Sequence, residues 1–319
     1  MRQSNALNRR TVLAGAAGSL ALCAVSVRAQ SQMFKVRVNR IPIAPYVPTN
    51  LAIDRGWFKD QGLEISIEAV AAGAVAIQAL VAGKLDLIYT SLDIPLRAHA
   101  QGFNVVILSD NNNAPMKPPV SSAILVRNDA GIKTLKDIEG KRFLVNNLNN
   151  INWAYSRESI AKAGGDPEKV QFLEVEFPRM VDALIGGQAE AASITEPFTT
   201  IGKSTGKLDV ASYMFVDVQP GLNIAGWVAN ADWVKQHHKE ALAFRSVLQK
   251  AMDFINGNHE ERTKALLKYT SLKPDLVGQI VLDEWTTKID PEDLQKQVAV
   301  YKRQGMIDKA YDAKSVIVD

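Results

Sequence analysis

Cysteine is almost absent from this chain of 319 residues. The single cysteine, Cys23, lies in an N-terminal apolar stretch. One thiol can form neither an intrachain disulfide nor a cysteine metal site, so neither is expected to stabilise the fold. A lipid anchor through Cys23 stays open, although Leu22 occupies the position where a lipoprotein signal needs a small residue.

Patterns of enzyme chemistry are also lacking. The sequence contains no nucleophile elbow, phosphate-binding loop or dinucleotide fingerprint. Asp93 and Glu196 could pair as catalytic carboxylates, but a glutamate before proline more commonly anchors a strand end or a backbone amide. We therefore predict no enzyme activity, no cofactor and no metal. Four histidines lack the spacing of metal ligands, namely His99, His237, His238 and His259.

Neither sign of charge is in large excess. The 37 basic and 34 acidic residues give a net charge of +3. Residues 1–29 hold four of the arginines and no acid, so the rest of the chain has a net charge of −1. A nucleic-acid-binding surface needs a clear basic excess, so we predict no nucleic-acid partner.

The first 29 residues have the pattern of an export signal. Arg9 and Arg10 precede an apolar run over residues 12–27, and small residues surround a cleavage point at Ala29. The paired arginines favour the twin-arginine route. General secretion stays open, because Asn8 departs from the usual twin-arginine pattern. The apolar run is short for a membrane anchor, so we predict a cleaved leader and a periplasmic mature protein.

Residues 73–91 read as a helix, a glycine turn and a strand that ends in hydroxyl residues. Apolar residues at helical spacing lead to Gly83, and a strand-like run follows. Thr90 and Ser91 then stand at the strand's end. Ligands of open α/β sheets bind beyond the carboxyl ends of strands, so these hydroxyls are candidate ligand contacts.

The same pattern returns 104 residues later, where residues 183–190 parallel residues 79–86 and Thr195 falls opposite Ser91. A second similarity relates the segments around residues 38–67 and 145–175. Chance similarity of two α/β units is the alternative explanation. We predict two similar lobes.

The alternation of strands and helices predicts an α/β fold in which each lobe is a mostly parallel sheet flanked by helices. We assign residues 30–125 and 228–319 to lobe I and residues 126–227 to lobe II. The chain is expected to cross between them near residues 123–128 and 222–228, which would form a hinge. Residues 199–218 are expected to form an irregular connection, and residues 275–285 a helix.

Four segments together resemble a known family, the periplasmic solute-binding proteins of ABC importers of the nitrate/sulfonate/taurine and thiamine-pyrimidine-precursor type. These segments are residues 51–58, 79–86, 135–141 and 183–198. The resemblance implies a two-lobed, type II periplasmic binding protein fold that closes on a small ligand and delivers it to a membrane permease.

Ligand identity does not follow from this resemblance, because loops at the strand ends differ between members. Residues 146–152 are rich in asparagine where the family commonly has a Gly/Ser-rich turn, so a simple nitrate- or sulfate-like ligand is disfavoured.

The predicted ligand-binding residues lie at expected strand ends, at helix starts and in the asparagine-rich loop. Some have plain structural alternatives: the asparagines could form a polar turn, Trp153 could pack in the core, and the two arginines could be surface residues. The predicted set is Arg40, Tyr46, Gly73, Thr90, Ser91, Asn147, Asn150, Asn152, Trp153, Arg179, Thr195 and Glu196.

The predicted function is capture of a small organic anion for import. We expect a carboxylate or sulfonate, aromatic acids included, bound by a monomer. Two alternatives are a protein that binds or makes the thiamine pyrimidine precursor and a periplasmic sensor subunit.

Overall fold

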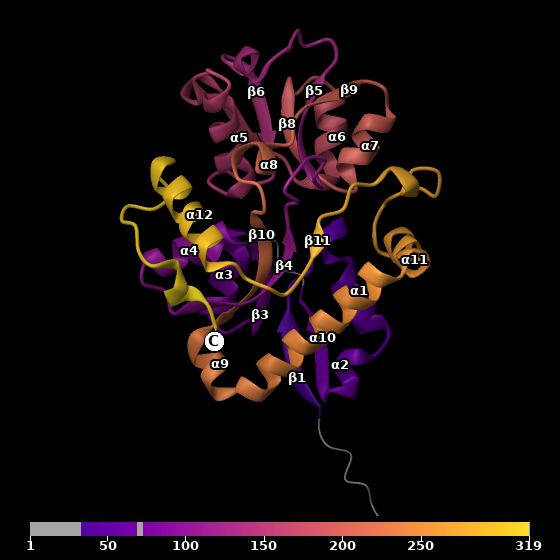
Figure 1. Ribbon diagram of the computed structural model, residues 1–319, viewed down its shortest axis with the longest axis vertical. Coiled ribbons are helices and arrows are strands. Elements are labelled where there is room, and N and C mark those ends of the chain that lie inside the picture. The colour runs from indigo at the N-terminus through magenta and orange to yellow at the C-terminus, as the bar shows by residue number, and fades with distance from the viewer. Residues whose placement is uncertain (1–32, 69–72, 319) are drawn as a thin grey trace, which may run out of the picture. The chain divides into compact units, whose positions relative to one another are not determined.

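The computed structural model describes residues 33–68 and 73–318 (Figure 1). Two β-sheets organise this part of the chain, and helices pack against both. The predicted leader, residues 1–29, lies outside the described residues, as do Ala71 and Ala72 of the small-residue turn before Gly73.

The first sheet has six strands in the spatial order β11-β4-β10-β3-β1-β2. Strand β1 pairs in parallel with β2 and β3, whereas β10 lies antiparallel between β3 and β4. The short β11 runs antiparallel to β4 at one edge. The strands are β1 (Phe34–Val38), β2 (Leu63–Ile67), β3 (Leu87–Ser91), β4 (Val105–Asn113), β10 (Asn223–Asn230) and β11 (Glu284–Trp285).

The second sheet has five strands in the order β7-β6-β8-β5-β9. Strand β6 pairs in parallel with β7 and β8, and β5 lies antiparallel between β8 and β9. The strands are β5 (Ser122–Arg127), β6 (Arg142–Val145), β7 (Gln171–Glu174), β8 (Ala191–Thr195) and β9 (Leu208–Ser212).

The two sheets share one spatial plan. Without β11, the first sheet reads β2-β1-β3-β10-β4 and the second reads β7-β6-β8-β5-β9. Each has one reversed strand in the same place, and the other strands of the plan run in one direction. The predicted α/β class is therefore confirmed, with most strands of each sheet pointing the same way, but the reversed strands make the ladders mixed. The predicted repeat corresponds to equivalent strands.

Helices cover the sheets and fill the connections. On the first sheet, α1, α2 and α10 pack against one another, while α3 and α4 pack against β3 and β4. The C-terminal helix α12 contacts α4, which follows β3, and α5, which follows β6 (Figure 1). The α-helices are α1 (Val47–Asp54), α2 (Trp57–Asp60), α3 (Ala74–Val81), α4 (Asp93–Ala100), α5 (Ile151–Lys162), α6 (Phe177–Ile185), α7 (Phe198–Ser204), α8 (Met214–Val218), α9 (Ala231–Gln236), α10 (His238–Gly257), α11 (His259–Tyr269) and α12 (Pro291–Arg303). Short 3-10 turns are η1 (Ala44–Tyr46), η2 (Leu135–Ile138), η3 (Pro167–Lys169), η4 (Val277–Gln279) and η5 (Ala313–Val316).

Both faces of the first sheet are buried, because successive side chains of a strand point to opposite faces. On β3, Tyr89 belongs to the main core together with Trp227, whereas its neighbour Ile88 packs in a second cluster beneath α3. Phe244 of α10 covers the main face, with its ring centroid 4.8 Å from that of Trp227. Such two-sided burial is typical of parallel strands.

One ion-pair arrangement occurs in both halves. Asp86, just before β3, accepts from the backbone N–H of Arg37 at 2.7 Å and from its guanidinium at 2.6 Å. Glu190, just before β8, accepts from the backbone N–H of Arg142 at 2.9 Å and from its guanidinium at 2.6 Å. Each carboxylate thereby ties the start of one strand to its parallel neighbour, at the end of β1 in the first sheet and at the start of β6 in the second.

The chain passes between the sheets earlier than predicted. Residues 122–126 pair fully with β8, and residues 225–229 pair with β3, so neither segment is a crossing. The passages are residues 114–121 and 213–222. An extended crossing and a strand look alike in sequence, and only the pairing partner distinguishes them. The two lobes and their rotation stay predictions.

Two further local predictions were wrong. Residues 275–285 contain η4 and β11 rather than an α-helix, and residues 199–218 contain α7, β9 and α8 rather than an irregular connection. The N–H of Val281 bonds Glu196, and β11 pairs with β4, so tertiary contacts override the local periodicity.

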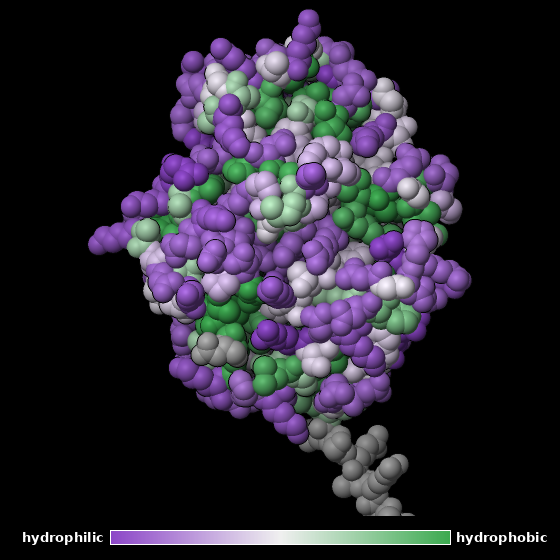
Figure 2. Space-filling model, in the orientation of Figure 1, coloured by the Kyte–Doolittle hydropathy of each residue, from purple (hydrophilic) through white to green (hydrophobic). Residues whose placement is uncertain are grey.

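On the face that Figure 2 shows, hydrophilic side chains surround several separate apolar patches. Across residues 33–68 and 73–318, no helix combines the length and the apolar character needed to cross a bilayer.

Candidate ligand-binding site

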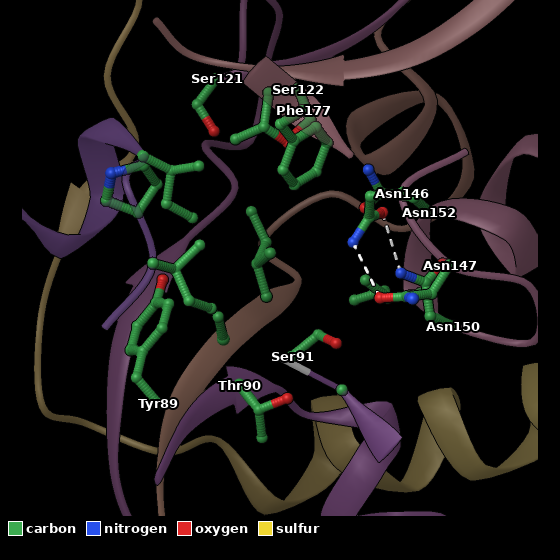
Figure 3. Close-up of a pocket in the computed structure, with 18 of the residues that line it drawn as sticks. Tyr89, Thr90, Ser91, Ser121, Ser122, Asn146, Asn147, Asn150, Asn152 and Phe177 are labelled. Carbon is green, nitrogen blue, oxygen red and sulfur yellow. Dashed lines mark hydrogen bonds between the residues drawn. The ribbon is translucent and has the colours of Figure 1, made fainter. Parts of the chain in front are cut away.

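A cavity of about 250 Å³ lies where the carboxyl ends of strands from both sheets meet (Figure 3). Strands β3 and β8 end at it, as does β4, and the asparagine-rich loop leads from β6 past it into α5. Cavities of this kind hold small molecules. Its lining comprises Arg40, Ile41, Pro42, Ile43, Pro45, Gly73, Tyr89, Thr90, Ser91, Asn112, Ser121, Ser122, Asn146, Asn147, Asn150, Ile151, Asn152, Glu176, Phe177, Pro178, Thr195, Ile224 and Ala225.

The structure brings most of the predicted binding residues to this cavity. Those that line it are Arg40, Gly73, Thr90, Ser91, Asn147, Asn150, Asn152 and Thr195. Those that do not are Tyr46, Trp153, Arg179 and Glu196.

The hydroxyls at the strand ends lie where the repeat places them. Thr90 and Ser91 end β3, and Thr195 ends β8. The Thr195 Oγ1 atom lies 2.8 Å from the Oγ atom of Ser122, which begins β5. Equivalent strand ends of the two sheets therefore contribute hydroxyls to one cavity.

The asparagine-rich loop both builds a helix start and lines the cavity. Asn150 caps α5 by accepting from the Trp153 N–H at 3.0 Å, and its amide donates to Asn146 Oδ1, also at 3.0 Å. Asn150 is thus a structural cap, as a polar turn would require, and it also lines the cavity, while its contact with a ligand stays a prediction.

The side chain of Asn147 lies so close to Gly73 that it leaves little room for a larger residue there. A Cβ atom at Gly73 would lie 3.2 Å from Asn147 Oδ1, and the φ of Gly73 is +71°. Both the left-handed backbone and the close approach of the loop favour glycine there.

Asn152 has the clearest unmet hydrogen-bonding capacity in the lining. Its side chain is 4% exposed, and its Nδ2 has no partner among the described residues. A buried amide without a partner costs about 1–3 kcal/mol. A ligand acceptor at this position would remove that cost.

Glu196 and Tyr46 have structural roles instead. Glu196 accepts from the backbone N–H of Thr200 at 2.9 Å and that of Val281 at 3.2 Å. It therefore anchors backbone amides, and burial raises its pKa to about 7. Tyr46 is fully buried, donates to the carbonyl oxygen of Asn39 at 2.7 Å, and has a pKa raised by burial.

Trp153 and Arg179 also lie away from the lining. The Trp153 ring packs 6.0 Å from Phe172, with the Arg157 guanidinium 4.5 Å from its centre. Core packing, the alternative for Trp153, is what the structure shows. Arg179 is exposed on α6, whose first two residues, Phe177 and Pro178, line the cavity.

Charged groups are sparse at the cavity. Among the described lining residues, Arg40 is the one cation and Glu176 the one acid. Asp93 is buried outside the lining, and burial raises its pKa to about 6 against the opposing effects of Ser91 and of Arg97, whose Nη1 is 3.8 Å away. Neither Asp93 nor Glu196 lines the cavity, so no carboxylate pair faces it.

Sequence reasoning missed the apolar part of the lining and one polar wall. The proline-rich loop after β1 contributes Ile41 to Ile43 with Pro45, and the polar wall contains Asn112 and Ser121. A signal for this wall was present, since residues 111–113 are three asparagines at the end of a predicted strand. Across residues 33–68 and 73–318, no group of three or more metal-ligating side chains occurs.

Known proteins with this architecture bind small solutes. A protein of Bacillus subtilis, provisionally named as an aliphatic sulfonates-binding protein, is 22% identical over 283 residues, or 85% of this chain and 82% of its own length. The periplasmic aliphatic sulphonate-binding protein SsuA from Escherichia coli superimposes with a TM-score of 0.74 at 17% identity, over 89% of this chain and 97% of its own.

The periplasmic nitrate-binding protein NrtA from Synechocystis PCC 6803 superimposes with a TM-score of 0.73 at 16% identity, over 89% of this chain and 85% of its own. At these identities the likeness to both solved structures establishes the fold, and the resemblance inferred from sequence is confirmed at that level. A profile described as NMT1/THI5 like matches residues 45–262, more than half of the chain. This protein therefore belongs to the NMT1/THI5-like family.

Proposed function

We propose that this protein captures a small organic acid in the cavity and delivers it to the membrane permease of an ABC importer. The observation that carries the proposal is the cavity itself, which combines strand-end hydroxyls of both sheets with the unpartnered amide of Asn152. Solved structures of the same fold are described as binding aliphatic sulphonates and nitrate.

The acid group fits the end of the cavity formed by α5. Asn152 lies in the first turn of this helix, where unpaired N–H groups and the helix dipole favour negative charge. Ser91 and Thr195 add hydroxyls, and Arg40 adds the one cation among the described lining residues. Each hydrogen bond to a charged group contributes roughly 1.5–3 kcal/mol, so a few, less the cost of association, give a dissociation constant of about a micromolar.

The apolar lining supports an organic body on the ligand. Residues 41–43 lie on one loop, while Phe177 and Ile224 come from α6 and β10. Burying apolar ligand surface against these side chains contributes about 25 cal/mol per Å². A bare inorganic anion would leave this surface unused, so a carboxylate or sulfonate with a carbon skeleton, aromatic acids included, fits better.

Capture and release require the two halves to move. On this proposal they are lobes that rotate about residues 114–121 and 213–222. Arg97 of α4 donates to the carbonyl oxygen of Asn149, which joins the first half to the asparagine-rich loop. This contact supports a closed form, and its loss would accompany opening. The exported chain would act as a monomer in the periplasm.

A thiamine pyrimidine precursor is the second candidate ligand. The amides of Asn147 and Asn152 can both donate and accept, which suits the edge of a heterocycle. The related alternative of an enzyme has less support, because Asp93 and Glu196 lie outside the cavity lining.

A thermal-shift screen of the mature protein separates these ligands. We expect carboxylates or sulfonates to raise the unfolding temperature, and titration calorimetry to give micromolar affinity. Stabilisation by the pyrimidine alone, or by cations alone, would overturn the organic-acid proposal.

An uptake assay in a deletion strain separates import from sensing. Loss of the gene should abolish uptake of the acid that binds. Normal uptake, with altered signalling only, would instead identify a sensor subunit.

A further inference from the structure

Asp283, just before β11, gathers hydrogen-bond donors behind one wall of the cavity. It is buried and does not itself line the cavity. Its Oδ1 accepts from the Ser121 N–H at 2.9 Å, and its Oδ2 accepts from Ser121 Oγ at 2.5 Å and from Asn112 Nδ2 at 2.7 Å. Burial raises the pKa of the Asp283 carboxyl, and the hydrogen bonds from Ser121 and Asn112 oppose that rise. Three donors on two oxygens is the pattern of an ionised carboxylate, which can only accept.

This arrangement fixes what the wall offers to a ligand. Ser121 gives its hydroxyl hydrogen to Asp283, and Tyr89 gives its hydroxyl hydrogen to Asn112 Oδ1 at 3.2 Å. Both hydroxyl hydrogens are already donated to other protein groups, so these two hydroxyls can offer a ligand only their oxygen lone pairs. We call these three lining residues, Tyr89, Asn112 and Ser121, the acceptor wall.

The other polar side of the cavity has the opposite character. Figure 3 draws Tyr89 and Ser121 on one side and the labelled asparagines on the other. There the buried Nδ2 of Asn152 has no partner among the described residues, and α5 begins. Donors on one side and acceptors on the other give the cavity a hydrogen-bonding direction.

We infer that the ligand is a small organic acid that also carries a hydroxyl or amino group, which donates to the acceptor wall while the acid group accepts at Asn152. Asp283 is the positioning residue that imposes this requirement. The inference rests on the proposed function and adds the second group to the ligand. A ligand with methyl or methoxy in place of the hydroxyl would leave buried acceptors unpaired, and sites of this kind discriminate strongly.

Matched sets of acids test the inference by titration calorimetry. One set is para-hydroxybenzoate, para-methylbenzoate and para-methoxybenzoate; the other is isethionate, propanesulfonate and methoxyethanesulfonate. In the wild type, the hydroxyl member of the set that fits should bind about ten-fold more tightly than its two partners.

Asp283→Asn should reverse this preference. The new amide keeps its oxygen on the Ser121 N–H and turns its NH₂ toward Ser121 Oγ and toward Asn112, whose own amide turns over to accept. The hydroxyl hydrogens of Ser121 and of Tyr89, which then accepts from Asn112, are released to the cavity. The ratio of hydroxyl to methoxy affinity should then fall more than ten-fold, from about ten to below one. Glu284→Gln is the matched control, because it removes the same charge from the exposed neighbouring residue and should leave the ratio unchanged.

Ser121→Ala provides an independent test if Asp283→Asn does not fold. It removes an acceptor without adding a donor, so the hydroxyl preference should shrink without reversing. Equal binding of all three members by the wild type, or an unchanged ratio in Ser121→Ala and in folded Asp283→Asn, would overturn the inference and leave the organic-acid proposal intact. If none of the acids binds while neutral or cationic ligands do, both fail.

Discussion

The two halves share a sheet plan and differ in the loops that reach the cavity. Both have the same strand order, the same arginine–carboxylate tie and a hydroxyl residue at the matching strand end. After β1, however, the chain forms a loop with Ile41 and two prolines, whereas after β6 it forms the asparagine-rich loop. The repeated parts hold the sheets, and the unrepeated loops give the cavity an apolar side and an asparagine-rich side.

The largest expected effect is on the free energy of unfolding, and it should differ between the two reversed strands, β10 and β5. Gly226 pairs with Thr90, and a Cβ atom there would lie 2.3 Å from the carbonyl oxygen of Ser109. The equivalent residue of β5 is Ala123, which pairs with Ile194. We expect Gly226→Ala to lower the free energy of unfolding by about 3 kcal/mol or more.

Ala123→Gly should lower it by only about 1 kcal/mol, because just a small buried side chain and some backbone entropy are affected. Urea denaturation of both variants measures the contrast. Equal losses would mean that the reversed strands are equally close to their neighbours.

The next effect concerns Asp93. Its equivalent in the second half, 104 residues later, is Pro197, so only the first half has an acidic residue at this position. Burial raises the pKa of Asp93 to about 6, from about 3.9 in an unfolded chain. Between these values the folded state binds more protons, so the Asp93 contribution to stability falls as the pH rises, by about 3 kcal/mol in total.

Asp93→Asn cannot ionise. Its free energy of unfolding relative to wild type should therefore rise by about 2 kcal/mol between pH 4 and pH 7, as measured by urea denaturation at each pH. A pH-independent difference would contradict this prediction.

The arginine–carboxylate ties should differ in strength although they are equivalent in position. The side chain of Asp86 is 7% exposed and that of Glu190 is 19% exposed. Removing the arginine leaves the more buried carboxylate at a greater disadvantage. Because both arginines are partly exposed, we expect Arg37→Met to cost about 2 kcal/mol and Arg142→Met to cost less. Thermal unfolding of the pair tests the order, and a reversed order would refute it.

The last comparison concerns the strand-end hydroxyls, and its effect is on ligand binding and not on stability. Ser91→Ala and Thr195→Ala should each weaken ligand binding about ten-fold, or about 1.4 kcal/mol, without unfolding the protein. Ser204→Ala is the control, because its hydroxyl bonds the carbonyl oxygen of Ile201 at the exposed end of α7. Calorimetry with the best acid of the screen measures all three. Wild-type affinity in both cavity variants would remove these hydroxyls from the site.

The sequence was sufficient to predict the parts of the site that lie at regular strand ends. Ser91 and Thr195 could be placed because strand periodicity and the repeat locate the carboxyl ends of β3 and β8. Asn152 could be placed because a helix start follows the asparagine-rich loop.

The rest depended on contacts between distant segments. The orientation of Ser121 depends on Asp283, which is 162 residues away. Tyr46 and Trp153 each follow a lining residue in the sequence. The local sequence pattern, however, does not determine whether an aromatic ring faces a cavity or the core. The crossings were misplaced for a similar reason, because strand partners are not encoded locally.

The position of β10 determines the order in which the two sheets can form during synthesis. All strands of the second sheet lie before residue 213, whereas β10, which separates β3 from β4 in the first sheet, begins at Asn223. A growing chain can therefore complete the second sheet while the first still lacks a central strand. The N-terminal strands emerge from the ribosome first, yet they belong to the sheet that is finished last.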